Sequence, residues 1–126
     1  MIPAQLYYTE DHEWVRVEGD IATVGITDHA VKELGDIVFV DLPEVGSQIE
    51  QMAEFGSVES VKTVSGLFLP VSGEVVAVNA DALSEPAVLN DSPYEDGWLI
   101  QVRMADPKEL EDLLSAADYK THLESL

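Results

Sequence analysis

Gly56–Val61 (Gly-Ser-Val-Glu-Ser-Val) and Thr63–Leu69 (Thr-Val-Ser-Gly-Leu-Phe-Leu) lie on either side of one lysine, Lys62. Two alternating runs that meet with almost nothing between them predict a β-hairpin, with the lysine at or next to its tip. Hairpin tips usually carry Asn-Gly, Asp-Gly or Gly-X, because those residues tolerate positive φ. Val61–Val64 contains none of these. We therefore expect that the lysine side chain is what matters at this position.

The charge around this lysine narrows its chemistry. Lys62 is the only cation between residues 33 and 102, a window with thirteen Asp and Glu side chains. Most lysines at β-turns take part in no chemistry. Nearby anions favour the ammonium form, which argues against a Schiff-base role that needs a neutral amine. An exposed lysine on a rigid turn is instead suited to acylation by another enzyme.

Composition excludes several classes of function. The chain has 126 residues, 46% of them apolar, so we expect a single folded domain spanning 1–126. Its formal charge of −19 argues against nucleic acid and anionic membranes as partners. There is no cysteine, and His12, His29 and His122 are scattered without metal-ligand spacing. The N-terminus resembles neither a signal peptide nor a transit peptide, which predicts a cytoplasmic, bacterial protein, with a processed mitochondrial form as the alternative.

Outside the central hairpin, the pattern predicts further short strands and helices. A hairpin is expected around Glu18–Asp20, and a helix over Asp28–Leu34, capped by Thr27 or Asp28 and ended by Gly35. A buried strand is expected over Asp36–Leu42. The remaining predictions are strands over Gly73–Asn79 and Trp98–Met104 and a short helix opening at Ser84–Pro86 and ending near Asn90.

The C-terminal region changes to a helical period. Asp106–Glu109 has the form of a capping box, with a capping Asp, a proline at the first helical position and Glu at the third. An apolar stripe follows, and Ser115–Asp118 is expected to restart a helix. The stripe consists of Leu110, Leu113, Leu114 and Ala117. The whole pattern indicates a mainly β sandwich or flattened barrel.

The hairpin sequence resembles the lipoyl-attachment region of the H protein of the glycine cleavage system. The resemblance covers about residues 6 to 123 and follows the family's order of motifs. It implies a barrel-sandwich hybrid of two antiparallel sheets, with short helices and a C-terminal helix outside. The other motifs that carry it are Tyr8–Val15 (YTEDHEWV), Val24–Ala30 (VGITDHA), Leu34–Val40 (LGDIVFV), Pro70–Val75 (PVSGEV) and Ser92–Leu99 (SPYEDGWL).

The resemblance implies that Lys62 carries lipoate in amide linkage and that the chain is a monomeric, non-catalytic carrier. The expected partners are a pyridoxal-phosphate glycine decarboxylase, a tetrahydrofolate-dependent aminomethyltransferase, a flavin (FAD) dihydrolipoamide dehydrogenase and the lipoylating enzymes. The arm would take the aminomethyl group of glycine from the first enzyme to the second, and electrons to the third. The cofactor would hold the reactivity and the protein the geometry.

Single residues carry over from the resemblance. Glu59 and Gly73 match positions used in recognition by lipoylating enzymes, although Gly73 has an alternative interpretation as a simple turn. Glu13 matches a glutamate in the cleft that shelters the aminomethylated arm, and a solvent-facing strand residue is the alternative. Gly66 departs from the family, where many members have an acidic residue. The aromatic residues Trp14, Phe39, Tyr94 and Trp98 are expected to be core or cleft wall.

Four other functions are considered. Lipoyl domains of 2-oxoacid dehydrogenases usually show Asp-Lys-Ala at the tip, and biotin carriers usually show Met-Lys-Met. Ser60–Val64 fits neither pattern. A lipoyl donor that feeds other lipoyl domains, and an unmodified interaction protein, would keep the same tip, so the sequence leaves both open.

Overall fold

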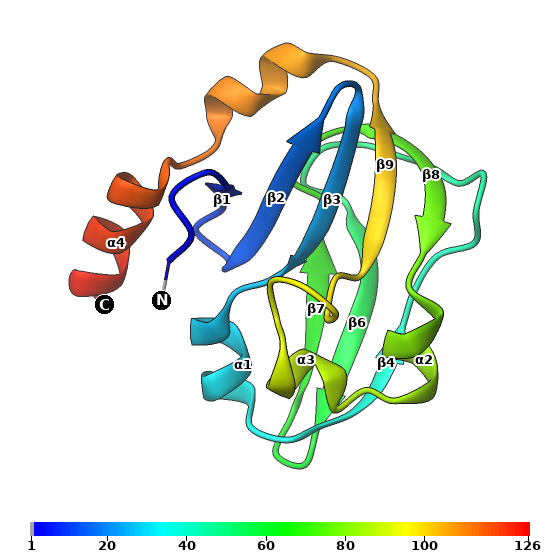
Figure 1. Ribbon diagram of the computed structural model, residues 1–126, viewed down its shortest axis with the longest axis vertical. Helices are drawn as coiled ribbons and strands as arrows, with labels where there is room; N and C mark the ends of the chain where they lie inside the picture. The colour runs from blue at the N-terminus through cyan, green and yellow to red at the C-terminus, as the bar shows by residue number, and fades with distance from the viewer. Residues whose placement is uncertain (1) are drawn as a thin grey trace.

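The computed structural model describes residues 2–126 as two antiparallel β-sheets with short helices around them (Figure 1). The first sheet has six strands in the order β1-β2-β3-β9-β8-β5, and the second has three in the order β4-β6-β7. The two sheets do not close into a barrel. The strands are β1 (Tyr7–Tyr8), β2 (Glu13–Glu18), β3 (Ile21–Ile26), β4 (Ile37–Asp41), β5 (Gln48–Ile49), β6 (Glu54–Ser60), β7 (Val64–Phe68), β8 (Gly73–Val78) and β9 (Ile100–Met104).

The helices are short and lie at the ends of the sheets. In Figure 1, α1, α2 and α3 lie at the end toward which the β6–β7 turn projects, and α4 lies at the side, beside β1. No helix within residues 2–126 is long and apolar enough to span a membrane. The helices are α1 (Asp28–Leu34), α2 (Ala80–Ser84), α3 (Val88–Asp91), the 3₁₀ helix η1 (Pro107–Asp112) and α4 (Ala116–Glu124).

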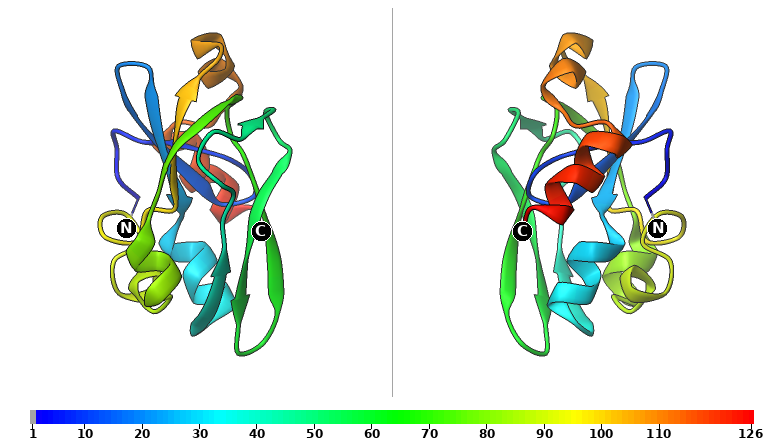
Figure 2. Two further views of the ribbon diagram at one scale, coloured as in Figure 1. Left: turned by 90° about the vertical axis from the view of Figure 1, so that its right-hand side faces the viewer. Right: turned by 90° about the vertical axis from the view of Figure 1, so that its left-hand side faces the viewer.

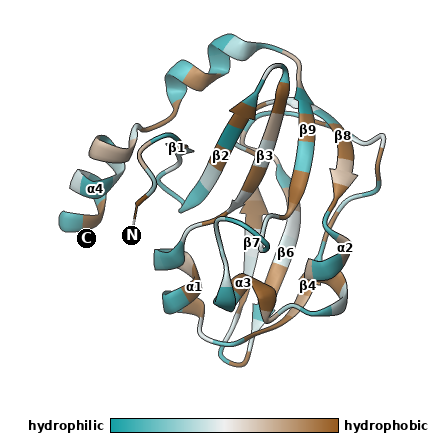
Figure 3. Cartoon of the chain, viewed as in Figure 1, coloured by the Kyte–Doolittle hydropathy of each residue, from teal (hydrophilic) through white to brown (hydrophobic). Residues whose placement is uncertain are grey.

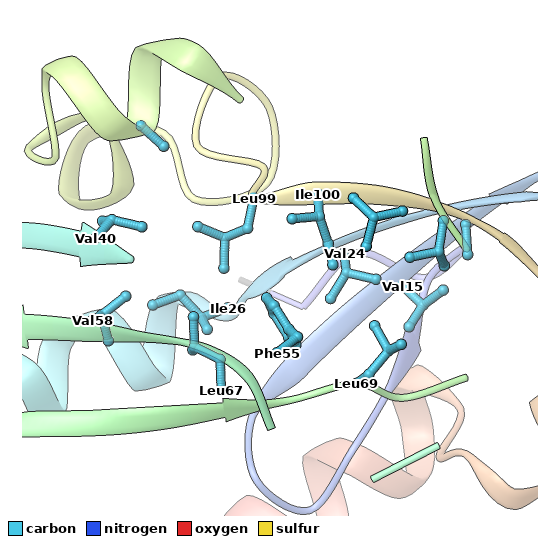
Figure 4. Packing of buried hydrophobic residues seen from close by; sticks show 14 of the residues in the cluster. Val15, Val24, Ile26, Val40, Phe55, Val58, Leu67, Leu69, Leu99 and Ile100 are labelled. Atoms are coloured by element: carbon cyan, nitrogen blue, oxygen red, sulfur yellow. The ribbon is translucent and has the colours of Figure 1, made fainter. Parts of the chain in front are cut away.

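The hydrophobic core lies between the two sheets. Hydrophobic and polar residues alternate along strands such as β9, so one face of each is apolar (Figure 3). Val58 and Leu67 of the smaller sheet point toward Ile26 of the larger sheet and toward Leu99, which comes just before β9 (Figure 4). The inner face of the β6–β7 hairpin therefore packs in the core, which fixes the position of the turn.

A second apolar cluster attaches the C-terminal helix. It contains Leu6, Tyr8, Trp14 and Tyr119, and the rings of Tyr8 and Tyr119 stack with centroids 4.6 Å apart. Tyr8 also forms an isolated β-bridge with Leu114. Figure 2 shows α4 on the outside of the molecule, as the sequence predicts.

Most of the predicted elements are confirmed. The early hairpin pairs β2 with β3, α1 spans Asp28–Leu34, and Thr27 caps α1 by accepting a hydrogen bond from the N–H of Ala30. Gly35 ends the helix with φ 83°. Ser115 caps α4 by accepting from the N–H of Asp118.

Three predictions are wrong in detail. Strand β4 is not buried throughout, because a bulge between Ile37 and Phe39 leaves Val38 and Phe39 exposed. The helix predicted to open at Ser84–Pro86 and end near Asn90 is instead two helices, because α2 ends at Ser84 and α3 spans Val88–Asp91.

The predicted capping box does not form. Glu109 does not reach back to Asp106 as a capping box would require. Its carboxylate instead accepts hydrogen bonds from the N–H and hydroxyl of Ser72, at 2.7 and 2.8 Å. Asp106 does cap the segment, by accepting from the N–H of Lys108, but η1 winds as a 3₁₀ helix. The Glu109 carboxylate thus connects η1 to the segment before β8.

Candidate functional site

The turn between β6 and β7 is built around the hydroxyl of Ser60. Ser60 Oγ accepts hydrogen bonds from the N–H groups of Lys62 and Thr63, at 3.1 and 3.2 Å, and the N–H of Ser60 donates to the Thr63 carbonyl at 2.8 Å. Neither Val61 nor Lys62 has a positive φ. The turn therefore needs no Asn-Gly or Asp-Gly pair, because a buried serine side chain satisfies its backbone.

A further contact ties the turn to the neighbouring loop. The N–H of Val61 donates to the carbonyl of Asp36, between α1 and β4, at 3.1 Å. Lys62 itself is exposed, and within residues 2–126 no acidic side chain forms an ion pair with it. A Cβ placed on Gly35 would lie 3.2 Å from Lys62 Cε, so the lysine stem rests on this glycine. An accessible amine thus stands on an anchored turn.

Glu59 lies close to Lys62, on the outer face of the smaller sheet. It pairs with Phe39 of β4 on one side and with Val64 of β7 on the other. All three side chains are exposed, Phe39 by 56% and Val64 by 63%. Phe39 is not a core residue, because its ring is exposed beside the turn.

Glu13, by contrast, is buried, with only 2% of its surface exposed. The Thr9 hydroxyl donates to Oε1 at 2.6 Å, and the N–H of Phe68 in β7 donates to Oε2 at 3.4 Å. Burial raises the pKa of Glu13 to about 7, although these hydrogen bonds oppose the shift. The alternative interpretation of Glu13 as a solvent-facing residue is therefore wrong.

A cleft of about 390 Å³ opens next to the Thr9 side of this arrangement. Thr9 lines it, together with Asp11 and Met52, whereas neither Glu13 nor Lys62 does. Glu13 therefore lies behind the wall of the cleft, hydrogen-bonded to Thr9.

Gly66 has no acidic side chain, but the carboxylate of Glu54 lies next to it. A Cβ built on Gly66 would lie 2.5 Å from Oε1 of Glu54 and 3.5 Å from the ring of Phe68. Glu54 pairs with Phe68 across the hairpin, which brings its carboxylate over the glycine. A carboxylate is thus present beside β7 even though residue 66 has no side chain.

Gly73 does not lie with the other site residues. It begins β8, at the opposite end of the molecule from the β6–β7 turn (Figures 1 and 2). Any Cβ at Gly73 would collide with the carbonyl oxygen of Arg103 in the paired strand β9. A glycine is required here for packing, so the simple-turn interpretation is replaced by close approach of two strands.

The three histidines are scattered in sequence but gather in space. The His12 ring lies 4.6 Å from that of His29 and 5.9 Å from that of His122, centroid to centroid. His12 Nδ1 is 2.8 Å from the hydroxyl of Tyr119. Burial and the other two histidines lower the pKa of His12. The part of the chain that the structure describes contains no group arranged to hold a metal ion.

The sequence analysis did not identify Ser60, Gly35 or Glu54 as residues of the site. Ser60 could have been found, because a serine two residues before the amide it accepts from is a known turn device. Gly35 and Glu54 meet the site only through tertiary packing, and no spacing signals them.

Comparison with known proteins identifies the family. Residues 6–126 match the family model described as Glycine cleavage H-protein. The chain is 51% identical to the glycine cleavage system H protein of Halothermothrix orenii over 125 residues, covering 99% of this chain and 98% of that protein. It is 56% identical to the one from Halalkalibacterium halodurans over 119 residues, covering 94% and 93%.

A solved structure agrees with this. The crystal structure of a glycine cleavage system H protein from Mycobacterium marinum matches with a TM-score of 0.90 and 43% identity, covering 99% of this chain and all of that one. Sequence and fold agree over nearly the whole length. The chain belongs to the glycine cleavage H-protein family.

Proposed function

We propose that this chain is the lipoyl carrier of a glycine cleavage system, with lipoate attached through an amide to Nζ of Lys62. The observation that carries the proposal is the turn itself. It presents a single exposed lysine, fixed by Ser60 and Asp36, on a hairpin whose inner face is packed in the core. A modifying enzyme can reach this amine without unfolding the carrier.

The residues around Lys62 fit a long covalent arm. Gly35 leaves room for the lysine stem, and the described residues offer its ammonium no ion pair that acylation would break. The dithiolane, once attached, supplies the redox and aminomethyl-carrying chemistry. The chain contributes position: it holds the attachment point in the solvent and leaves bond-making to other enzymes.

Glu13 is proposed to stabilise a cationic group carried on the arm. In its ionised form it would accept a charge-assisted hydrogen bond, which is about twice as strong as a neutral one. A pKa of about 7 places this carboxyl at the point where a nearby cation would favour ionisation. Glu59 and Gly73 are proposed to serve recognition by the lipoylating enzymes, Gly73 from the far end of the fold.

The partners proposed are the pyridoxal-phosphate decarboxylase, the tetrahydrofolate-dependent aminomethyltransferase and the flavin dehydrogenase. A tethered arm makes each transfer local, so effective concentration replaces tight docking. We further propose that residues 1–126 act as one monomeric carrier domain in the bacterial cytoplasm, without catalytic activity of their own.

Two measurements test the proposal. Intact mass and peptide mapping of protein made in lipoate-producing cells should place one lipoyl group on Lys62, and a group on Lys32, Lys108 or Lys120 would contradict it. The modified protein should support glycine-dependent release of carbon dioxide only when the decarboxylase is present. Release without that enzyme would contradict the carrier role.

The second candidate, a lipoyl donor for other proteins, makes a different prediction. Such a donor would lose its lipoyl group to another lipoyl domain when a transferase is added, yet would support no glycine cleavage. Running both assays on one preparation separates the two functions.

A further inference from the structure

An apolar rim surrounds the attachment lysine. Val38, Phe39, Val61 and Val64 form this rim, and their exposed fractions are 50%, 56%, 67% and 63%. They make up half of the large hydrophobic side chains that are exposed in residues 2–126. Single exposed apolar residues are ordinary, but four beside one functional atom indicate a contact surface.

The pairing of the strands explains why the rim is continuous. Phe39, Glu59 and Val64 stand side by side across β4, β6 and β7, on the outer face of the smaller sheet. Val61 is in the turn next to Lys62, and the bulge in β4 exposes Val38 together with Phe39. These exposed side chains do not contribute to the hydrophobic core. The core is filled from the other face of the same strands, where Val40 and Val58 are buried.

Acidic side chains lie around the rim. Glu33 of α1, Asp36 of the loop after it and Asp41 of β4 are exposed, and Glu59 of β6 is exposed between Phe39 and Val64. Protein interfaces commonly combine apolar and aromatic contacts with polar and charged neighbours. The complementary surface on a partner would be an apolar patch bordered by lysine or arginine.

The position of Lys62 Nζ, the atom that is acylated, indicates which enzyme docks on the rim. An enzyme that reaches the tip of a long arm can dock at a distance, but the enzyme that forms the amide must bring its active site to Nζ itself. A stable interface covers about 800 Å² on each partner. An enzyme centred on Nζ must therefore cover the residues next to Lys62.

We infer that the apolar rim is the docking surface for the enzyme that acylates Lys62, and that Phe39 and Val64 are its anchors; this rests on the proposed lipoylation. Amide formation joins Nζ to the carboxyl carbon of an activated acyl donor, such as an acyl adenylate made from lipoate and ATP. The bond between that carbon and the phosphate oxygen breaks, and AMP departs with its electron pair. The nitrogen loses two protons as it changes from an ammonium to an amide.

The test uses the apo-protein and an ATP-dependent lipoate ligase, with transfer followed by intact mass. The double variant Phe39→Ser/Val64→Thr should lose at least about tenfold in kcat/KM, mainly through KM, because the loss of two interface anchors weakens docking of the ligase. The matched control is Val45→Thr, since Val45 is 61% exposed but lies outside the rim. It should stay within about twofold of the original protein.

A second pair of measurements keeps the inference open to contradiction. The conservative variant Phe39→Tyr/Val64→Ile should be acylated normally, which a loss of folding would not allow, and the melting temperature of every variant is compared. The double variant, once fully lipoylated by prolonged incubation, should keep its KM for the decarboxylase within about threefold. Unchanged acylation, or equal losses in both reactions, would overturn the inference.

Failure of the proposed function would look different. In that case the original protein itself would carry no lipoyl group on Lys62, before any variant is compared.

Discussion

In two short turns of this molecule, a side-chain hydroxyl accepts hydrogen bonds from the backbone, but the two turns place their ionisable side chains differently. In the β6–β7 turn, Ser60 Oγ accepts from two backbone N–H groups and leaves Lys62 in the solvent. In the turn before β2, Thr9 Oγ1 accepts from the N–H of Glu13 and donates to its carboxylate, which is buried. The Ser60 hydroxyl leaves a charged side chain exposed, whereas the Thr9 hydroxyl binds a titratable side chain that is buried.

The two turns differ in what they do for the side chain: one makes an amine accessible, and the other shifts the pKa of a carboxyl. The Lys62 amine is exposed, so other enzymes can reach it. A buried carboxyl feels desolvation in full, and its pKa shifts to about 7. The first turn is suited to receiving a covalent group, and the second to responding to a charge nearby.

The largest effect is expected at the exposed turn. Lys62→Arg should abolish lipoylation and glycine cleavage, because a guanidinium does not form the lipoyl amide. The fold should remain, since surface substitutions usually change the free energy of unfolding by less than about 0.5 kcal/mol. A reconstituted glycine cleavage assay and a melting curve check both parts.

Lys32→Arg is the matched control for this substitution. Lys32 is also exposed, but it lies on α1 and pairs with Asp28 at 3.9 Å. Full activity of this variant is expected. Glycine cleavage retained by Lys62→Arg would contradict the attachment site.

The next effect concerns the buried turn and depends on pH. Glu13 holds its proton up to about pH 7 in the folded chain, against an ordinary value of 4.5. The folded state thus binds more protons between these values, so the free energy of unfolding falls as pH rises from about 4.5 through about 7. The loss is up to about 3 kcal/mol for a shift of this size.

Glu13→Gln removes this titration, so the difference in stability between the two proteins should itself vary with pH over that window. Urea unfolding between pH 4.5 and 8 measures it. The control is Glu59→Gln, which changes an exposed carboxylate in the same way and should leave the slope as it is. A parallel pair of curves for Glu13→Gln and the original chain would show that the carboxyl is not tuned by burial.

The fold was largely predictable, because it depends on local patterns. The alternation around Lys62, the cap at Thr27 and the restart at Ser115 each act within a few residues, and each is confirmed. The site was less predictable. The prediction for Lys62 depends only on its isolation in the sequence. The burial of Glu13, the carboxylate of Glu54 over Gly66 and the gathering of the histidines depend on distant segments.

Exposure of Phe39 was mispredicted for a related reason. A run of apolar residues in Asp36–Leu42 is typical of a buried strand, and sequence alone does not show that a bulge turns two of them outward. Sequence reasoning is expected to fail at functional or strained sites, and this error falls on the rim that we propose as a docking surface.

A smaller effect is expected from the hydroxyl that holds the exposed turn. Ser60→Ala removes the acceptor for the N–H groups of Lys62 and Thr63, which should cost about 1 kcal/mol. Acylation should also slow, because the lysine is less well fixed. The control is Ser57→Ala, in the same strand, and thermal unfolding with a lipoylation time course measures both. Equal effects of the two variants would show that Ser60 adds nothing beyond ordinary strand packing.

The smallest effect separates the two turns by their response to salt. Charges at the exposed turn attract partners over distances that salt shortens, from about 10 Å at 0.1 M to about 3 Å at 1 M. With a formal charge of −19, the apparent KM of the lipoylated chain for the decarboxylase should rise about three- to fivefold over this range, while kcat changes little. The pH window assigned to Glu13 should stay in place, because a buried group is screened much less. Steady-state kinetics and urea unfolding in the same salt series measure the two responses. A KM that ignores salt would mean that apolar contacts dominate docking, and a window that moves with salt would mean that Glu13 is tuned by surface charge rather than by burial.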